Sequence, residues 1–356
     1  MFFVWYNKHM KLENLYCKVW GSIHEKLYRD LDKKNYKTPN SLIEELNIRY
    51  SDDAPENIFN MYYPRVKSDE PLPTIVHVHG GAYVSGKLEL TDEYCRLLAE
   101  QGYCVINMEF VNSQKEGFPR PVYDVFRLFK FLETNEINKH IDFDNFFMSG
   151  DSAGGHVASL VANIQTNEEL KINYNLTGGP KIKGCILSSA MMGVYRFRGL
   201  WPKQVLEDIV FKENSKTEIV DMSHNLNNLT NKFPPTIMIS ACNDFIKTHS
   251  NIFTKIAPEY NLYAEHWTMT SGKHLKHDVN IIEPYDYECL VANSKINSFI
   301  KNIVNNNIQQ GQQGVIKGKI NSKSKIDAGF VYDKTKTNFY KQEEQKILEN
   351  LTIEKI

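Results

Sequence analysis

The sequence predicts an α/β fold in which a mostly parallel central β-sheet is flanked by helices on both faces. Short apolar runs with the composition of buried strands alternate with segments whose apolar residues recur every three or four positions. Parallel strands need crossover connections, and this alternation supplies them as helices. The length of 356 residues and the hydrophobic content of 42% allow one large domain with an ample core.

The predicted elements follow one another along the chain. The N-terminal segment, residues 1–45, holds a helix over 10–35, and the alternating pattern at 58–63 predicts an early strand. The main domain is expected to span residues 46–304. Its buried strands are predicted at 74–79, 103–108, 146–149, 182–188, 236–241 and 262–267, and its helices at 91–102, 121–133, 156–163, 245–257 and 287–303.

Two stretches break the alternation. Residues 191–232 contain no strand pattern, and a segment of that length between two strands is usually functional. We therefore expect an insertion that forms a helical cap together with residues 1–45, although a peripheral insertion is the alternative. Residues 305–356 are of low complexity and rich in polar residues, which predicts a C-terminal tail outside the core, mobile or loosely docked.

The bulk properties of the chain bear on its partners and its location. A net charge of -1 at pH 7 gives no general reason to expect a nucleic-acid or anionic-membrane partner. The apolar block at residues 1–6 is too short for a signal-peptide core, and no other run is long enough to span a bilayer. We expect a cytoplasmic protein without stable membrane insertion, and the sequence leaves its oligomeric state open.

The clearest chemical signal lies at residues 146–163. An apolar run leads into Gly-Asp-Ser-Ala-Gly at residues 150–154, and a helix-compatible segment follows. Gly-x-Ser-x-Gly at a strand-to-helix turn is the pattern of a nucleophile elbow, which holds a serine hydroxyl out of the sheet. The pattern alone is equally compatible with a glycine-rich turn, so Ser152 needs support from the rest of the chain.

A serine nucleophile needs a histidine that takes its proton, a carboxylate that orients the histidine, and N–H donors for the oxyanion. In chains with an elbow the oxyanion loop precedes the serine, and the acid and the histidine follow it. Here Gly80 and Gly81 come directly after a predicted strand, and glycines let backbone N–H groups approach a substrate carbonyl. Ala153 would be a third donor, and His79 is expected to brace the loop.

The acid and the base are sought after the serine. Asp244 follows the strand at 236–241, at the carboxyl end where α/β sheets place functional groups, and its alternative role is a helix N-cap. His274 and His277 lie on the loop after the next strand. Spacing alone does not choose between these two histidines.

At these residues the chain resembles the hormone-sensitive-lipase branch of α/β-hydrolase esterases and lipases. The matching motifs are the oxyanion loop at 79–82, Gly-Asp-Ser-Ala-Gly-Gly at 150–155, Phe-Pro-Pro-Thr at 233–236 and Asn-Asp at 243–244. The resemblance covers residues 50–304 and implies an α/β-hydrolase fold. The roles it implies are nucleophile for Ser152, acid for Asp244, and oxyanion donors for Gly80, Gly81 and Ala153.

The chain departs from the family pattern in two places. The usual His-Gly-Phe turn for the base is missing, but Leu-Lys-His at residues 275–277 resembles the Leu-Gly-His of small bacterial relatives, which favours His277 over His274. Residues 109–113 read Glu-Phe-Val-Asn-Ser where the family tends to have Tyr-Arg-Leu-x-Pro-Glu. The second departure concerns the acyl pocket rather than the catalytic groups.

Together these features predict a serine carboxylic-ester hydrolase that works through an acyl-enzyme and needs no metal or cofactor. The expected substrates are small: short- or medium-chain acyl esters, or acetylated small molecules. Two alternatives stay open, namely an amide or formamide hydrolase with the same triad, and a non-catalytic relative that binds a small ligand.

Overall fold

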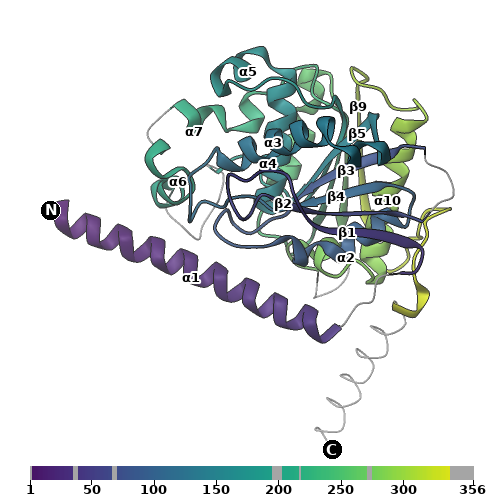
Figure 1. The fold of residues 1–356 in the computed structure, drawn as a ribbon, viewed down its shortest axis with the longest axis horizontal. Helices are drawn as coiled ribbons and strands as arrows, with labels where there is room; N and C mark the ends of the chain where they lie inside the picture. Colours follow the sequence, from purple (N-terminus) through teal and green to yellow (C-terminus); the bar gives the residue numbers. More distant parts are fainter. Residues whose placement is uncertain are drawn as a thin grey trace, which may run out of the picture.

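A nine-stranded sheet forms the centre of the protein in its computed structural model, which describes residues 2–34, 39–65, 70–194, 203–215, 218–270 and 275–336 (Figure 1). The strand order is β1-β2-β4-β3-β5-β6-β7-β8-β9. β1 (Leu42–Arg49) and β2 (Ile58–Pro64) pair antiparallel, and every pair from β4 to β9 is parallel. The predicted, mostly parallel sheet is therefore confirmed.

The strands of the parallel part lie close to their predicted positions, apart from the last one. Most of their residues are buried, as expected where helices cover both faces. They are β3 (Leu72–Val78), β4 (Cys104–Met108), β5 (Ile141–Asp151), β6 (Ile182–Ser188), β7 (Thr236–Ala241), β8 (Tyr263–Met269) and β9 (Gly314–Ile320).

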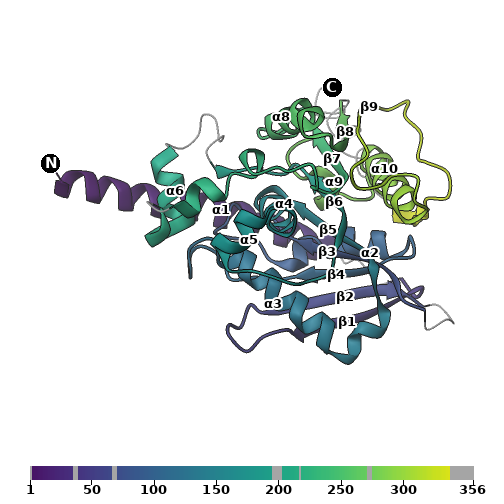
Figure 2. The same cartoon turned by 90° about the horizontal axis from the view of Figure 1, so that it is seen from above.

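Different helices cover the two faces of the sheet (Figure 2). Because side chains alternate along a strand, Val76 of β3 packs in one hydrophobic cluster and its neighbour Ile75 in another. The first cluster includes α3 (Arg120–Thr134), α4 (Ser152–Thr166), α5 (Glu168–Tyr174) and α8 (Thr248–Ile256). The second includes α2 (Asp92–Ala99), α9 (Val279–Ile282) and α10 (Tyr287–Val304).

The N-terminal segment forms one long helix, α1 (Phe2–Lys34), which begins earlier than the pattern predicts. Its N-terminal end extends beyond the insertion helix α6 (Lys203–Phe211) in both views of the ribbon (Figure 1, Figure 2). α6 falls in the predicted insertion, together with the short α7 (Glu218–Met222). No helix in the described ranges, α1 included, combines the length and the apolar character needed to cross a bilayer.

The prediction that residues 305–356 lie outside the core is wrong for a large part of the segment. β9 pairs in parallel with β8 at the end of the sheet, and Ile320 is buried. Further along, Phe330 packs in a small cluster with Leu97 and Leu290. The glycines and lysines of β9 obscure its alternation, and lysine is common on edge strands because it discourages further pairing. Residues 337–356 lie outside the described part.

Candidate active site

Ser152 occupies a sharp turn between β5 and α4, as the elbow pattern predicts. Its φ of 50° lies in the left-handed region, which is strained for a residue with a Cβ. A Cβ on Gly154 would lie 2.1 Å from the carbonyl oxygen of Val78 in β3, so this position requires glycine. The turn therefore packs directly against the strand that leads into the oxyanion loop.

Ser152, His277 and Asp244 form a hydrogen-bonded chain. The Oγ of Ser152 lies 2.8 Å from Nε2 of His277, and Nδ1 of His277 lies 2.9 Å from Oδ1 of Asp244. Asp244 follows β7 and also accepts the N–H of Ile246 at 2.9 Å, so one carboxylate serves both the loop and the imidazole. The structure thus brings the three predicted side chains together, whereas His274 lies outside the described residues.

Electrostatics favour an ionised Asp244 and a protonated His277. Burial raises the pKa of Asp244, but the hydrogen bond and the charge of His277 outweigh it and lower that pKa overall. Burial also opposes the imidazolium of His277, yet the carboxylates of Asp278 and Asp244 raise its pKa to about 10. With Asp244 at Nδ1, the other ring nitrogen faces the serine hydroxyl.

Asp278 is a second acid at the imidazole, and the sequence analysis did not single it out. Its Oδ2 lies 3.0 Å from Nε2 of His277, the nitrogen that also faces Ser152. The residue has a left-handed φ of 57°, and its N–H donates to Oγ of Ser189 at 3.1 Å. The only sign of this contact in the sequence is that Asp278 directly follows His277. That position indicates a contact only when the conformation of the backbone is known.

The oxyanion loop differs from the prediction at Gly80. The N–H of Gly80 donates to Oδ2 of Asp151 at 3.0 Å and is therefore already satisfied. Gly81 has a φ of 138°, and a Cβ there would collide with the carbonyl oxygen of Ser85 at 1.7 Å. Among the hydrogen bonds described for this loop, none uses the N–H of Gly81 or Ala82. These two amides, rather than that of Gly80, fit the donor role beside Ala153.

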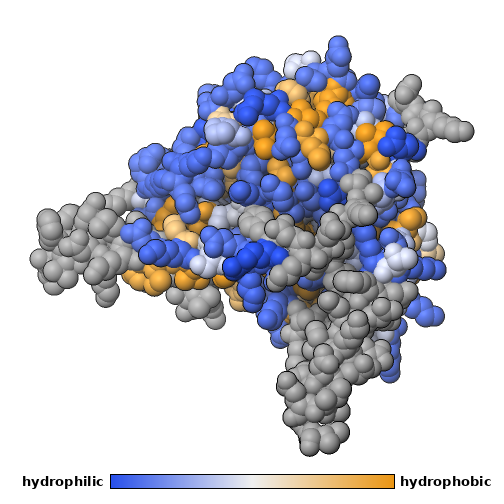
Figure 3. All heavy atoms as spheres, turned by 60° about the horizontal axis from the view of Figure 1, so that its bottom comes forward, coloured by the Kyte–Doolittle hydropathy of each residue, from blue (hydrophilic) through white to orange (hydrophobic). Residues whose placement is uncertain are grey.

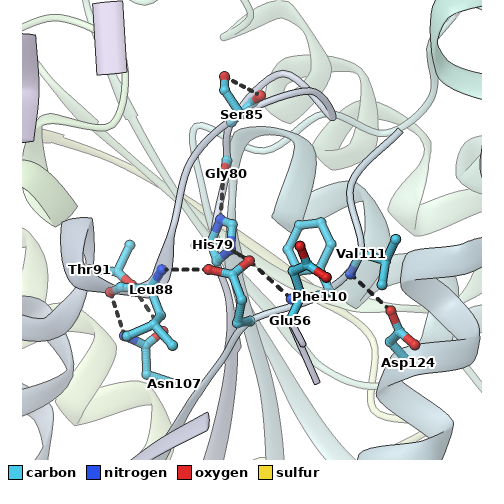
Figure 4. Close-up of polar contacts among 12 residues, drawn as sticks. Glu56, His79, Gly80, Ser85, Leu88, Thr91, Asn107, Phe110, Val111 and Asp124 are labelled. Carbon is cyan, nitrogen blue, oxygen red and sulfur yellow. Dashed lines mark hydrogen bonds and ion pairs between the residues drawn. The ribbon is translucent and has the colours of Figure 1, made fainter. Parts of the chain in front are cut away.

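His79 braces the loop as predicted (Figure 4). Its Nδ1–H donates to the carbonyl of Gly80 at 2.7 Å, its Nε2–H donates to Oε1 of Glu109 at 2.9 Å, and its ring stacks on Phe110. Burial opposes the charged ring, but the Glu109 carboxylate raises the pKa of His79 to about 8. Glu109 also accepts the N–H of Leu88 at 3.3 Å, so the unusual residue after β4 anchors two parts of the loop.

Helix α1 holds the other side of the oxyanion loop. The hydroxyl of Tyr16 donates to the carbonyl of Ala82 at 3.1 Å. Nδ1 of His24 lies 2.7 Å from Oγ of Ser85, which in turn donates to the carbonyl of Gly81 at 3.0 Å. The position of this loop therefore depends on a helix that lies far away in the sequence.

A cavity of about 540 Å³ lies between α1 and the Ser152 turn. Its apolar lining includes Trp20, Ile23 and Leu27 of α1, together with Phe245. Ile23 is 42% exposed and continues a strip of exposed apolar side chains on α1, whose other members are Leu15 and Val19. Figure 3, in which the bottom of Figure 1 comes forward, shows hydrophobic surface on this side of the molecule.

The insertion does not cover the cavity in the way the sequence predicts. No residue of 191–232 that the structure describes lines it. The insertion packs instead against α4, where Nε2 of His156 contacts the carbonyl of Ser223 at 2.7 Å, and Phe211 packs edge-on against Phe118. α1 therefore lies where a cap was expected, whereas the described part of the insertion meets the site at Met191, whose N–H donates to the carbonyl of Ser152 at 2.9 Å.

The arrangement can activate a hydroxyl and hold a negative charge. Ser152 has a base within hydrogen-bond distance, the base has a carboxylate partner, and backbone N–H groups lie in the adjacent loop. Within the described ranges, no group of three or more His, Cys, Asp and Glu side chains is arranged to hold a metal ion.

Known proteins share the sequence around this site. A family model described as BD-FAE matches residues 59–250. An arylesterase of Saccharolobus solfataricus is 27% identical over 177 residues, which cover 49% of this chain and 56% of that protein. Neutral cholesterol ester hydrolase 1 of Bos taurus is 34% identical over 116 residues, 31% of this chain and 28% of that protein. The chain thus spans only part of the length of these relatives.

The fold is also found among solved structures. Esterase B from Lactobacillus rhamnosis superposes with a TM-score of 0.74 at 24% sequence identity. The superposition covers 82% of this chain and 96% of esterase B. At this level of identity the likeness establishes the fold, and it confirms the predicted α/β-hydrolase architecture.

Proposed function

The chain belongs to the BD-FAE family, within the hormone-sensitive-lipase-like α/β-hydrolases, and from this premise we propose that it hydrolyses carboxylic esters through an acyl-enzyme on Ser152. The observation that carries the proposal is the continuous hydrogen-bonded chain from Ser152 through His277 to Asp244. The arylesterase and the cholesterol ester hydrolase among its relatives support the same chemical class.

The proposed reaction begins when Oγ of Ser152 attacks the ester carbonyl while Nε2 of His277 takes its proton. Asp244 keeps the other ring proton in place and stabilises the imidazolium. The N–H groups of Gly81, Ala82 and Ala153 hold the developing oxyanion. The imidazolium then protonates the leaving alcohol, and a water molecule, deprotonated by the same ring, releases the acid.

The proposed substrates are small esters with an apolar acyl or alcohol part. A volume of about 540 Å³ suits a small organic molecule, and Trp20, Ile23 and Leu27 give the wall an apolar character. Acyl groups of short or medium length fit this description, as do acetylated small molecules. A cytoplasmic location stays a prediction from the sequence, and cell fractionation would test it.

Labelling with a fluorophosphonate tests the proposal, because this probe reacts with an activated serine. We expect wild-type protein to be labelled and to hydrolyse p-nitrophenyl butyrate. Ser152→Ala should lose both activities, and Ser51→Ala in the β1–β2 loop serves as the matched control. Failure of the wild-type protein to label would contradict the proposal. Binding of the ester without release of acid would favour the non-catalytic relative.

A further inference from the structure

His277 has an acidic partner at each ring nitrogen. Nδ1 lies 2.9 Å from Asp244, and Nε2 lies 3.0 Å from Oδ2 of Asp278 and 2.8 Å from Oγ of Ser152. A neutral imidazole carries one N–H and cannot donate to two carboxylates at once. When both acids are ionised, the geometry therefore favours the imidazolium, which has no lone pair to accept the serine proton.

We propose that Asp278 is a positioning residue that keeps a proton on Nε2 of His277 and so sets the pH at which Ser152 becomes a nucleophile. The inference rests on the proposed function of Ser152 and His277. In the resting protein the serine hydroxyl and Asp278 compete for the same nitrogen. As the pH rises, the shared proton leaves, Nε2 gains a lone pair, and Ser152 can transfer its proton to it.

Burial and backbone contacts hold Asp278 in this position. The side chain is only 13% exposed, and the backbone of Asp278 is held by the N–H that it donates to Ser189. In the described part of the structure its Oδ1 is buried without a hydrogen-bond partner. The contact of Oδ2 with His277 is therefore the main polar interaction of this carboxylate. Burial raises the pKa of Asp278, and the two carboxylates raise that of His277, so both changes keep a proton in the pair.

Other charged groups around the pair have different roles. The negative charge of Asp151 lies near Asp278 and further raises its pKa, but its Oδ2 accepts the N–H of Gly80. Burial lowers the pKa of His24 to about 4, so this ring is neutral at higher pH. The remaining titratable side chains that line the same cavity are Lys26, Asp30, His79, Lys87, Lys276 and Glu283.

The test is the pH dependence of the second-order rate of fluorophosphonate labelling. Asp278→Asn removes the charge and tolerates a left-handed backbone, and Asp278→Gly adopts that backbone readily. We expect the wild-type midpoint to lie above the ordinary histidine value of about 6.5. In both variants the midpoint should fall by about 1–3 pH units, the usual effect of losing an opposite charge at this distance. At a pH below both midpoints, a midpoint that is lower by one pH unit should make labelling about tenfold faster.

The matched control is Glu283→Gln, which removes a negative charge elsewhere on the cavity wall. We expect it to move the midpoint far less than Asp278→Asn. A wild-type midpoint at or below that of a free histidine would overturn the inference without any variant. An unchanged midpoint in a folded Asp278 variant, or an equal change in Glu283→Gln, would also overturn it. Absence of wild-type labelling at every pH would instead reject the proposed function itself.

Discussion

Helix α1 and the insertion at residues 191–232 both have the sequence features of a cap, but of these two segments only α1 lines the cavity in the described part of the structure. The insertion meets the site at the backbone of Met191, whose N–H donates to the carbonyl of Ser152 at 2.9 Å. α1 lines the cavity and binds the oxyanion loop through Tyr16 and His24. The insertion also contacts α4, where the carbonyl of Ser223 meets the buried ring of His156. Amphipathic helices outside the sheet are therefore not equivalent, because their contacts decide which one can affect catalysis.

The two segments also differ in how they are held. The insertion is anchored by fully buried aromatic packing, with Phe211 against Phe118. α1 is held by one fully buried side chain, Tyr16, by hydrogen bonds and by half-buried side chains such as Trp20. Its Val19 and Ile23 stay exposed. Segments with few buried apolar contacts open more easily than well-packed ones. We therefore expect changes in the insertion to act on stability and changes in α1 to act on the reaction.

The largest expected effect comes from Phe211→Ala in the insertion. Removing a fully buried phenylalanine typically lowers the free energy of unfolding by about 3–5 kcal/mol. Urea unfolding would measure this loss. The kcat/KM for p-nitrophenyl butyrate should stay near wild type at temperatures where the variant is folded, because the described part of the insertion does not line the cavity.

Phe211→Leu is the matched control for this prediction. Leucine preserves much of the buried volume, so the variant should lose clearly less stability than Phe211→Ala. A large fall in kcat/KM for either folded variant would show that the insertion contributes to the site, and the contrast with α1 would then be wrong.

The sequence was sufficient to predict that Ser152, Asp244 and a histidine of the loop after β8 meet, although spacing alone left His274 and His277 open. Ser152, Asp244 and His277 each follow a buried strand, and the carboxyl ends of parallel strands converge at one edge of the sheet. Glycine spacing also predicted the elbow, since the close approach of Gly154 to Val78 excludes any other residue. These features depend on local patterns and on strand order, which the sequence carries directly.

Other features depend on contacts between distant segments, and these the sequence did not reveal. Gly80 was expected to donate to an oxyanion, but the carboxylate of Asp151 takes its N–H. Asp278 reaches His277 only because its own backbone turns into the left-handed region. β9 was missed because its polar composition resembles that of a loose tail, whereas an edge strand needs little apolar surface on its outer side.

The next prediction concerns the contacts of α1 with the oxyanion loop. Tyr16→Phe combined with His24→Leu removes both hydrogen bonds while keeping the side-chain volumes similar. We expect kcat to fall about tenfold or more, because loss of a single oxyanion donor costs about 10²–10³ in kcat and a displaced loop loses part of that stabilisation. The free energy of unfolding should fall by only about 1–3 kcal/mol.

Kinetics with p-nitrophenyl butyrate and urea unfolding measure the two effects of this double variant. Lys18→Ala, an exposed substitution on the same helix, is the control and should change neither. If the double variant keeps wild-type kcat, the loop holds its shape without α1, and α1 would only bound the cavity.

The smallest expected effect is a difference between two variants in the pH dependence of stability, with one histidine in each region. Burial lowers the pKa of His156 and of His24 to about 4. The unfolded chain binds a proton at each near pH 6.5, so the free energy of unfolding falls as the pH drops from about 6.5 to about 4, by at most about 1.4 kcal/mol per pH unit and site. Urea unfolding at a series of pH values measures this slope. His156→Gln should lower this slope by the contribution of one bound proton. His24→Leu should lower the slope by less, because local opening of α1 lets His24 bind a proton before the whole protein unfolds. Equal flattening in both variants would mean that α1 unfolds only with the rest of the protein, and the proposed difference between the two segments would not hold.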